Sequence, residues 1–447
     1  MPNGENTILK GKIFGPLIKF AIPLMLSILL QALYGAVDLI VVGKFGSTSS
    51  VSAVSNGSQV MHTVTGLITG LTMGVTVLVG RYVGAKDEEQ AARTVGAMIK
   101  LFAVIGILIT ITMVVFADKI AVLMQVPEAA LEKAVIYIRI CSSGAIFIVA
   151  FNAISGLFRG LGNSKSPLLF IAIACAVNIA GDLLLVAVFK LDAAGAAIAT
   201  VFAQTVSVLF SIYKIKKDGL PFAFGKEHLK NTGDFQKSIL KIGGPVALQD
   251  FLVSVSFLII MAIINTIGLV ASASIGIAEK LFVFLAIVPI SFMYALSAFV
   301  AQNVGAKQEH RAIKAMGIAM IVSFSFGVAM SALTYFEGDL LARVFEKNPV
   351  VIESTHSYLR GVSLEYMIIS IAFCFLGYFN GIGKTTFVMI AGLVSSFCFR
   401  IPLSYYLSRL PNTDLFTIGL AVPISAASSL VMCVVYYFFV RGKRLDM

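Results

Sequence analysis

Apolar residues in this chain fall into twelve long runs, each close to the length of a membrane-spanning helix. A helix that crosses the hydrocarbon core of a bilayer needs roughly 20 predominantly apolar residues. A transmembrane β-barrel would instead show repeated polar–apolar alternation in segments of about ten residues, and the chain lacks that pattern. The runs predict transmembrane helices at residues 14–42, 51–79, 95–116, 134–156, 167–189, 194–213, 239–264, 269–300, 315–336, 355–378, 385–407 and 417–440.

The longest polar stretch, residues 214–237, separates the first six runs from the last six. The two halves share sequence, because Val83–Lys86 recurs as Val304–Lys307 and Phe158–Gly162 recurs as Phe379–Gly383. Internal repeats of this kind are common in transporters. We therefore predict an all-α polytopic membrane protein with twelve transmembrane helices in two pseudo-symmetric six-helix bundles.

Three parts follow from this division: an N-terminal lobe at residues 1–217, a cytoplasmic linker at 218–237 and a C-terminal lobe at 238–447. Each half has an even number of spans, so both halves begin on the same side of the membrane and the repeat is parallel. Two like bundles suit alternating access, in which a cleft opens to each side in turn. The alternative, in which duplication only builds a stable bundle, stays open from the pattern alone.

Composition supports a membrane protein, since 58% of the residues are hydrophobic and only 13% are charged, with a mean hydropathy of +0.94. An ordinary soluble domain is about 25% charged. A net charge of +11 would suggest nucleic-acid binding in a soluble protein. Here the Lys and Arg residues concentrate in alternate connections, which the positive-inside rule places in the cytoplasm together with both termini.

One carboxylate, Asp38, lies inside the first membrane-length run. Ser27, Gln31, Tyr34 and Asp38 follow one another at steps of four, three and four, so a helix aligns them on one face. A charged side chain at the centre of a membrane helix costs about 2.5–3.5 kcal/mol on insertion scales. The stripe is therefore a candidate functional site.

A second acidic position lies in the fifth run, where Asn178 and Asp182 are four residues apart and share a helix face. At about 1.5 Å per residue, Asp38, Asp182 and Thr200 lie roughly 9, 12 and 10 Å from the outer ends of their spans. These three residues, Asn178 and Tyr34 can therefore meet at one level.

Two carboxylates at membrane depth need compensation. A bound cation would supply it, because carboxylate, amide and hydroxyl oxygens are suitable ligands for a small hard ion such as Na⁺. A shared proton would do the same, since two nearby carboxylates titrate as a coupled pair. The structural alternative is that Asp38 forms an ion pair with a basic residue.

The second half does not repeat this constellation. Counted from the starts of the halves, the positions that match Asp38 and Asn178 are Ile260 and Arg400. We expect the buried charges of this half to form structural ion pairs, such as Glu365 with Arg400. Asp250 is a candidate for the wall of a cleft.

Pro23 lies inside the first run, where it removes a backbone hydrogen bond and is a candidate hinge. A static kink that only serves packing is an equal alternative. Methionine side chains are adaptable and suit a wall that contacts varied ligands. Residues predicted to line a substrate cleft are Gln31, Gln204, Asp250, Met261 and Met293.

Several groups of residues form a combined pattern: Ile22-Pro23 with Tyr34, Asp38 and Val42-Gly43; Val83–Lys86; Phe158–Lys165; and Asn178 with Asp182. The combination resembles the multidrug and toxic compound extrusion (MATE) transporters, and within them the DinF-type branch. The resemblance extends over essentially the whole chain, and the combination is more specific than any single motif.

The resemblance implies two six-helix lobes in a V-shape, export of organic cations, and coupling to inward Na⁺ or H⁺. In the other branch of the family an acidic residue lies in the seventh span, where this chain has Val253. For the DinF-type branch the resemblance places the ion-coupling site in the N-terminal lobe, at Asp38, Asn178, Asp182 and Thr200, with Tyr34 beside them.

We therefore expect a cation-coupled antiporter of the cell membrane, monomeric and surrounded by lipid, that binds small organic cations and no nucleic acid. No cofactor apart from the coupling ion is expected, and motifs of soluble enzymes such as phosphate loops are missing. One alternative is a lipid-linked sugar flippase of the same superfamily, which favours a more basic cleft. Another is a membrane-embedded transferase, which would place metal-binding carboxylates at a cytoplasmic face.

Overall fold

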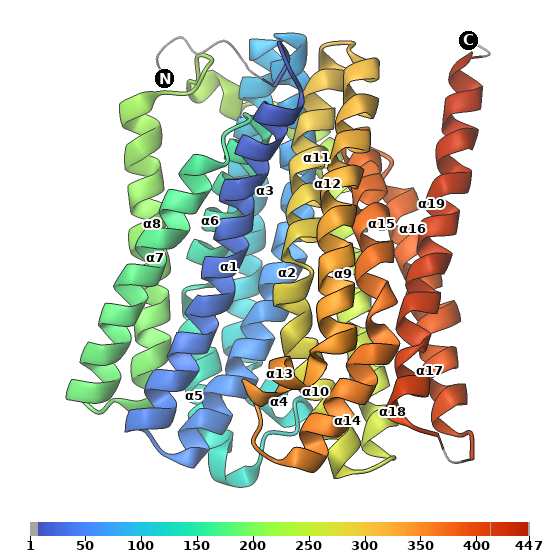
Figure 1. Ribbon diagram of the computed structural model, residues 1–447. Coiled ribbons are helices and arrows are strands. Elements are labelled where there is room, and N and C mark those ends of the chain that lie inside the picture. The colour runs from blue at the N-terminus through green and yellow to red at the C-terminus, as the bar shows by residue number, and fades with distance from the viewer. Residues whose placement is uncertain (1–7, 412, 446–447) are drawn as a thin grey trace. The chain divides into compact units, whose positions relative to one another are not determined.

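The computed structural model describes residues 8–411 and 413–445, with side chains described up to residue 440, and these residues form helices joined by short connections (Figure 1). Among the described residues, eleven helices are long and apolar enough to cross a membrane. A twelfth span is a broken one, in which α5 (Glu128–Ser143) and α6 (Ala145–Gly160) meet at an angle of 49°. The twelve predicted spans are therefore confirmed.

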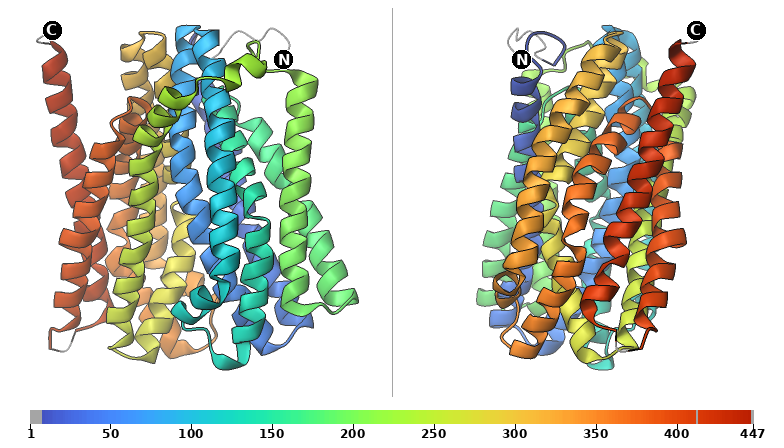
Figure 2. Two further views of the ribbon diagram at one scale, coloured as in Figure 1. Left: turned by 180° about the vertical axis from the view of Figure 1, so that it is seen from behind. Right: turned by 45° about the vertical axis from the view of Figure 1, so that its right-hand side comes forward.

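The chain divides into two compact units, and the first comprises residues 8–11, 22–247 and 301–307 of the described chain. Its helices run roughly side by side (Figure 2). Its apolar core includes a layer of small and branched side chains between α1, α2, α5 and α8. Besides α5 and α6, its helices are α1 (Phe14–Phe45), α2 (Thr48–Ala85), α3 (Glu88–Val115), α4 (Ala117–Leu123), α7 (Lys165–Asp182), the π-helix η1 (Leu183–Val188), α8 (Asp192–Asp218), the 3₁₀-helix η2 (Lys226–Leu229) and the start of α9 (Gly233–Asn265).

The second unit comprises residues 12–21, 248–300 and 308–445 of the described chain. Its core joins side chains from α10, α14, α15 and the chain around residues 418–426. Its helices are α10 (Leu269–Leu285), α11 (Ile287–Gly305), α12 (Glu309–Phe336), α13 (Gly338–Arg343), α14 (Pro349–Val362), α15 (Leu364–Gly381), α16 (Thr385–Leu393), the π-helix η3 (Val394–Arg400), α17 (Ile401–Ser408), α18 (Leu415–Gly419) and α19 (Ala421–Leu445).

Three helices change units along their length: α11, whose last residues from Ala301 on belong to the first unit, and α1 and α9, which change units close to a proline. The first turns of α1, up to Ala21, belong to the second unit, and the part of α9 up to Ala247 belongs to the first. Pro23 and Pro245 lie inside these helices, where each removes one backbone hydrogen bond. The lobe boundaries at residues 217 and 238 stay a prediction.

The repeated segments adopt the same local conformations. Lys86 and Lys307, which follow the last turns of α2 and α11, have left-handed φ angles of 59° and 58°. Gly162 and Gly383 have φ angles of 78° and 77°, a region that a residue without a Cβ enters at little cost. The sequence repeat is thus also a repeat of backbone structure.

Two of the repeated glycines mark a close helix crossing within the first unit. A Cβ on Gly84 would collide with the backbone carbonyl of Gln302, and a Cβ on Gly305 would collide with that of Arg81. Arg81 lies three residues before Gly84, and Gln302 lies three residues before Gly305. The two contacts are therefore equivalent, and the crossing is reciprocal. Only glycine allows the backbones of α2 and α11 to approach this closely.

Candidate functional site

Helix α1 carries Asp38 and Tyr34 into the interior of the first unit. Asp38 is only 2% exposed, although it lies in a helix whose other face is largely apolar and exposed. Tyr34, one turn earlier, is partly buried. Ser27 is the first polar residue of the helix face that carries Tyr34 and Asp38. Its hydroxyl donates a 2.7 Å hydrogen bond to the carbonyl of Pro23 within the same helix.

Helix α7 contributes Asn178 and Asp182, both fully buried. The α-helical hydrogen-bonding pattern ends at Asp182, and the π-helical segment η1 begins at the next residue. Such π-turns are rare and occur frequently at functional sites. Gly181 allows α7 to approach α8, because a Cβ at this position would lie 2.9 Å from the Cβ of Ala199. Small residues therefore hold the two helices together beside the site.

Helix α8 completes the group with Thr200. Its Oγ1 donates a 3.4 Å hydrogen bond to Oδ2 of Asp38. Asn178, Asp182 and Tyr34 lie within electrostatic range of the Asp38 carboxylate, without a hydrogen bond to it. The structure thus brings together the five residues that the sequence selects, from three helices.

Most polar atoms of this group have no hydrogen-bond partner. They are Oδ1 of Asp38, both carboxylate oxygens of Asp182, both side-chain polar atoms of Asn178 and the hydroxyl of Tyr34. Within the described residues, no Lys or Arg forms an ion pair with Asp38 or Asp182. Buried polar atoms are almost always partnered, so this donor set suits a proton or a small hard cation.

Two further side chains near the acids were not predicted from the sequence. Tyr137 and Cys141 are one turn apart on α5 and lie within electrostatic range of Asp38. The Tyr137 ring covers Gly57, and its hydroxyl is 3.0 Å from the hydroxyl of Ser58. Their four-residue spacing in the fourth apolar run was the available signal.

Lys133, a basic residue of the same unit, pairs with a carboxylate other than Asp38 and Asp182. Lys133 on α5 makes a 2.6 Å ion pair with Asp192 at the start of α8. Its ammonium also donates to the hydroxyls of Ser47 and Ser50. These contacts tie α2, α5 and α8 together and satisfy the lysine without Asp38.

In the second unit, the predicted ion pair between Glu365 and Arg400 is wrong. Within the described residues Arg400 forms no ion pair or hydrogen bond, and its guanidinium lies 4.3 Å from the centre of the Phe257 ring. Glu365 is within electrostatic range of Arg400 but not in contact with it. The guanidinium therefore contacts an aromatic ring rather than a carboxylate.

The predicted cleft residues differ in exposure. Gln31 is exposed, whereas Asp250, Met261 and Met293 are partly buried. Gln204, one turn from Thr200 on α8, is partly buried and has a side-chain oxygen without a partner. Their roles in substrate binding stay predictions.

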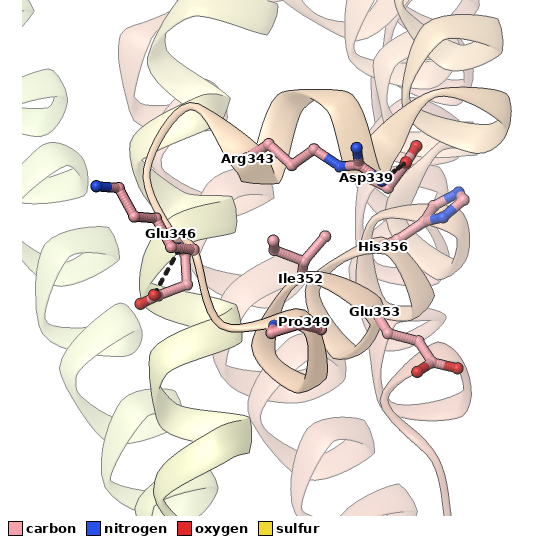
Figure 3. A pocket seen from close by; sticks show the side chains of 8 residues that line it. Asp339, Arg343, Glu346, Pro349, Ile352, Glu353 and His356 are labelled. Carbon is pink, nitrogen blue, oxygen red and sulfur yellow. Dashed lines mark hydrogen bonds and ion pairs between the residues drawn. The ribbon is translucent and has the colours of Figure 1, made fainter.

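A surface cavity of about 720 Å³ lies between α13 and α14 (Figure 3). The charged groups that line it are largely satisfied locally: Arg343 pairs with Asp339 at 3.2 Å, and His356 contacts the Tyr335 carbonyl. The backbone N–H groups of Asn348 and Lys347 hold the pKa of Glu346 below its usual value. The other charged residues of the lining, Lys347 and Glu353, are exposed, so this cavity lacks the buried, unpartnered carboxylates that distinguish the Asp38 site.

The chain is 25% identical over 448 residues to the probable multidrug resistance protein YpnP of Bacillus subtilis (strain 168), covering 98% of each chain. It is 22% identical over 427 residues to the multidrug export protein MepA of Staphylococcus haemolyticus (strain JCSC1435), covering 96% of this chain and 94% of that one.

Solved structures share the fold. One is an outward-facing conformation of a multidrug resistance MATE family transporter of the MOP superfamily, with a TM-score of 0.90, 22% identity, and coverage of 98% of this chain and 97% of that one. A MOP superfamily transporter from Pyrococcus furiosus, described as having a binding pocket of reverse polarity, also gives a TM-score of 0.90 at 22% identity, with the same coverage.

The family model named MatE matches the chain twice, at residues 23–184 and 245–406. The two matches are equal in length and begin at Pro23 and Pro245, which confirms the internal duplication. The relatives are transporters rather than enzymes, which confirms that prediction as well. Together the two matches cover well over half of the sequence, and the chain belongs to the MatE family of membrane transporters.

Proposed function

We propose that this protein is a cation-coupled antiporter of the cell membrane that exports organic cationic compounds by alternating access. In this proposal the coupling Na⁺ or H⁺ binds at Asp38 and Asp182, with Asn178, Thr200 and Tyr34 around them. The relatives named as multidrug resistance and export proteins support the export of organic compounds.

The observation that carries the proposal is the pair of buried carboxylates with unpartnered oxygens. Two negative charges in a low-dielectric interior repel each other, so the site is stable when a cation or proton is bound. An ion that binds one conformation better than the other shifts the equilibrium by its differential affinity. Ion and drug then favour opposite conformations, which couples their movements.

The energetics depend on stoichiometry. A membrane potential of 100 mV contributes about 2.3 kcal/mol per charge, and a tenfold ion gradient contributes about 1.4 kcal/mol. If one monovalent ion exchanges for one monovalent drug, the potential contributes nothing and the ion gradient alone drives export. We infer cytoplasmic termini from the basic connections in the sequence, and we propose that the protein acts as a monomer.

The experiment is uptake of a cationic dye into proteoliposomes under a Na⁺ gradient and, separately, under a pH gradient. The wild-type protein should respond to one of the gradients, and Asp38→Asn should respond to neither. Asp118→Asn is a matched control, because Asp118 is an exposed carboxylate of the same unit. Normal gradient-driven uptake by Asp38→Asn would exclude the coupling role.

A further inference from the structure

An ion pair joins helix ends at one end of the first unit, where α1 ends and α2 and α8 begin. Lys133 on α5 makes a 2.6 Å ion pair with Asp192, the first residue of α8. The ammonium also donates hydrogen bonds of 2.9 Å to the Ser47 hydroxyl and 2.8 Å to the Ser50 hydroxyl. A lysine ammonium has three N–H donors, so all of them are used here. We refer to Lys133, Asp192, Ser47 and Ser50 as the Lys133 clamp.

The clamp reaches the connection between α1 and α2. Ser47 caps the N-terminus of α2, because its hydroxyl accepts a hydrogen bond from the Ser50 N–H. A Cβ on Gly46 would lie 2.7 Å from Oδ1 of Asp192, so this connection lies directly against the carboxylate. The clamp therefore ties the connection between α1 and α2 to both α5 and α8.

The clamp and the acid site lie at different depths on the same helices. On α8, Thr200 follows Asp192 by eight residues, which is about 12 Å at the rise of an α-helix. On α5, Cys141 follows Lys133 by eight residues as well. On α1, Asp38 lies about two turns before the end of the helix. The clamp is thus about two helical turns nearer to the end of the unit than the site.

Buried apolar side chains fill the helix turns between the clamp and the site. They belong to one contact cluster, and each of those named here is at most 6% exposed. The layer includes Val41 and Val42 of α1, Ala134 and Ile138 of α5, and Ala193 and Ala197 of α8. An ion does not cross such a packed layer, because it would lose its hydration. The helices must therefore separate before an ion passes between this end of the unit and Asp38.

The second half repeats the fold without the clamp. Counted from either pair of repeated positions, the residue that matches Lys133 is uncharged, Ser354 or Thr355. Asp414, which matches Asp192 when counted from the two prolines, caps the N-terminus of α18 instead. Among the described residues, the clamp is therefore confined to the half that carries the two buried carboxylates.

We propose that the Lys133 clamp is a gate over the Asp38 site, and that its opening gives the coupling ion a route between the site and this end of the unit. The inference rests on the proposed ion coupling, and with cytoplasmic termini this end faces the outside. The side chains of Lys133 and Asp192 are 37% and 30% exposed, and ion pairs that are partly exposed contribute little to stability. The clamp can therefore break and re-form while the unit stays folded.

Access to the site is measured at Cys141, which is 1% exposed and lies two turns deeper than Lys133 on α5. The protein for this test keeps Cys141 and has its other four cysteines replaced by alanine. The rate of modification by a small cationic methanethiosulfonate reagent is followed by intact mass. Lys133→Ala should raise this rate by about tenfold, because a buried thiol reacts only when the structure around it opens. Lys119→Ala is a matched control, because Lys119 is an exposed lysine of the same unit that lies over the Phe116 ring.

Exchange of the two charges tests the pair itself. Lys133→Asp and Asp192→Lys should each raise the rate, and the two changes together should return it toward that of the unchanged pair. A lysine is accommodated at position 192, because the φ angle there is 56° and Lys190 already adopts a φ of 55°. A double variant that reacts as fast as the single variants would overturn the role of the pair.

Equal rates in Lys133→Ala and Lys119→Ala would also overturn the proposal. Cys374 provides the control for general loosening, because it is a fully buried thiol of the second unit. If Lys133→Ala accelerates modification of Cys374 as much as that of Cys141, the clamp is only structural and the proposal fails. The measurement needs no gradient, so it is independent of transport. Selective acceleration at Cys141 supports the gate even where neither gradient drives uptake, and its absence refutes the gate where uptake is normal.

Discussion

The two halves of this protein place different chemistry at matching positions of a duplicated fold. Counted from Pro23 and Pro245, where the two family matches begin, Asn178 and Arg400 occupy the same position; counted from Phe158 and Phe379, they are one residue apart. In the first half an amide stands beside two carboxylates. In the second half a guanidinium stands near two carboxylates. Duplication has kept the scaffold, and substitution has changed the charge that it presents.

The backbone near these positions is unusual in both halves. The π-helix η1 begins directly after Asp182, and the π-helix η3 ends at Arg400. A π-turn inserts an extra residue into a helix and changes which side chains face the interior. In the first half the π-helix follows Asn178 and Asp182 in the chain, whereas in the second half it ends at Arg400. The polar side chains of the fifth span are therefore aligned differently with the helix turns in the two halves.

The largest effect is expected when a buried carboxylate of the first half is neutralised, and the matching position of the second half serves as the control. Asp182→Asn should reduce gradient-driven uptake of a cationic dye to the level of protein-free vesicles, because one carboxylate alone no longer forms the proposed site. Ser404 occupies the position of Asp182 when counted from Pro245 and is also buried. Ser404→Ala should leave gradient-driven uptake unchanged.

Uptake is compared at equal amounts of reconstituted protein, and each variant is first checked for a single symmetrical peak in gel filtration. Loss of gradient dependence in Ser404→Ala would mean that both halves carry the coupling ion. The contrast between the halves would then be wrong.

Much of the fold could be predicted from the sequence, since span length and repeated turn motifs are local properties. Four runs predicted single spans that the structure divides into two helices each: 134–156 at Gly144, 269–300 at Ala286, 355–378 at Ser363 and 417–440 at Leu420. The shared level of Asp38, Asp182 and Thr200 followed from counting residues along each span. Helical rise is nearly constant, so depth is readable from sequence.

Rotation of helices about their axes is not readable in the same way. The expected pair of Glu365 with Arg400 does not form, because the guanidinium stacks on Phe257 instead. Tyr137 and Cys141 lie near Asp38 because α5 turns that face inward. Which side chains meet across helices depends on packing of the whole bundle, which one sequence does not specify.

The halves still share the glycine of the repeated Val-Gly-Ala-Lys segment, Gly84 in the first half and Gly305 in the second. Gly84→Ala and Gly305→Ala should each lower the free energy of unfolding by about 1–3 kcal/mol, because the added methyl group collides with a backbone carbonyl across the α2–α11 crossing. The two losses should be similar, since the contacts are reciprocal. The measurement is the midpoint of thermal unfolding in detergent.

Gly66→Ala provides the control for this pair. Gly66 lies in α2 like Gly84, but a Cβ there would meet nothing within 4 Å. Alanine has a higher helix propensity than glycine by about 1 kcal/mol, so this change should be neutral or stabilising. If Gly84→Ala and Gly305→Ala were as harmless as Gly66→Ala, the backbones would not be in close contact.

The smallest expected effect concerns surface charges that changed partner between the halves. Arg139 pairs with Asp118 at 3.0 Å. Arg360 matches Arg139 when the residues are counted from the repeated segments, and it lies 4.8 Å from the centre of the Tyr335 ring. Exposed ion pairs and exposed cation–ring contacts each contribute about 0–1 kcal/mol. Arg139→Ala and Arg360→Ala should therefore shift the unfolding midpoint only slightly. Added salt should reduce the effect of Arg139→Ala more than that of Arg360→Ala, because salt screens exposed ion pairs. A large or salt-independent loss in Arg139→Ala would show that this surface pair stabilises the first half as a buried pair does.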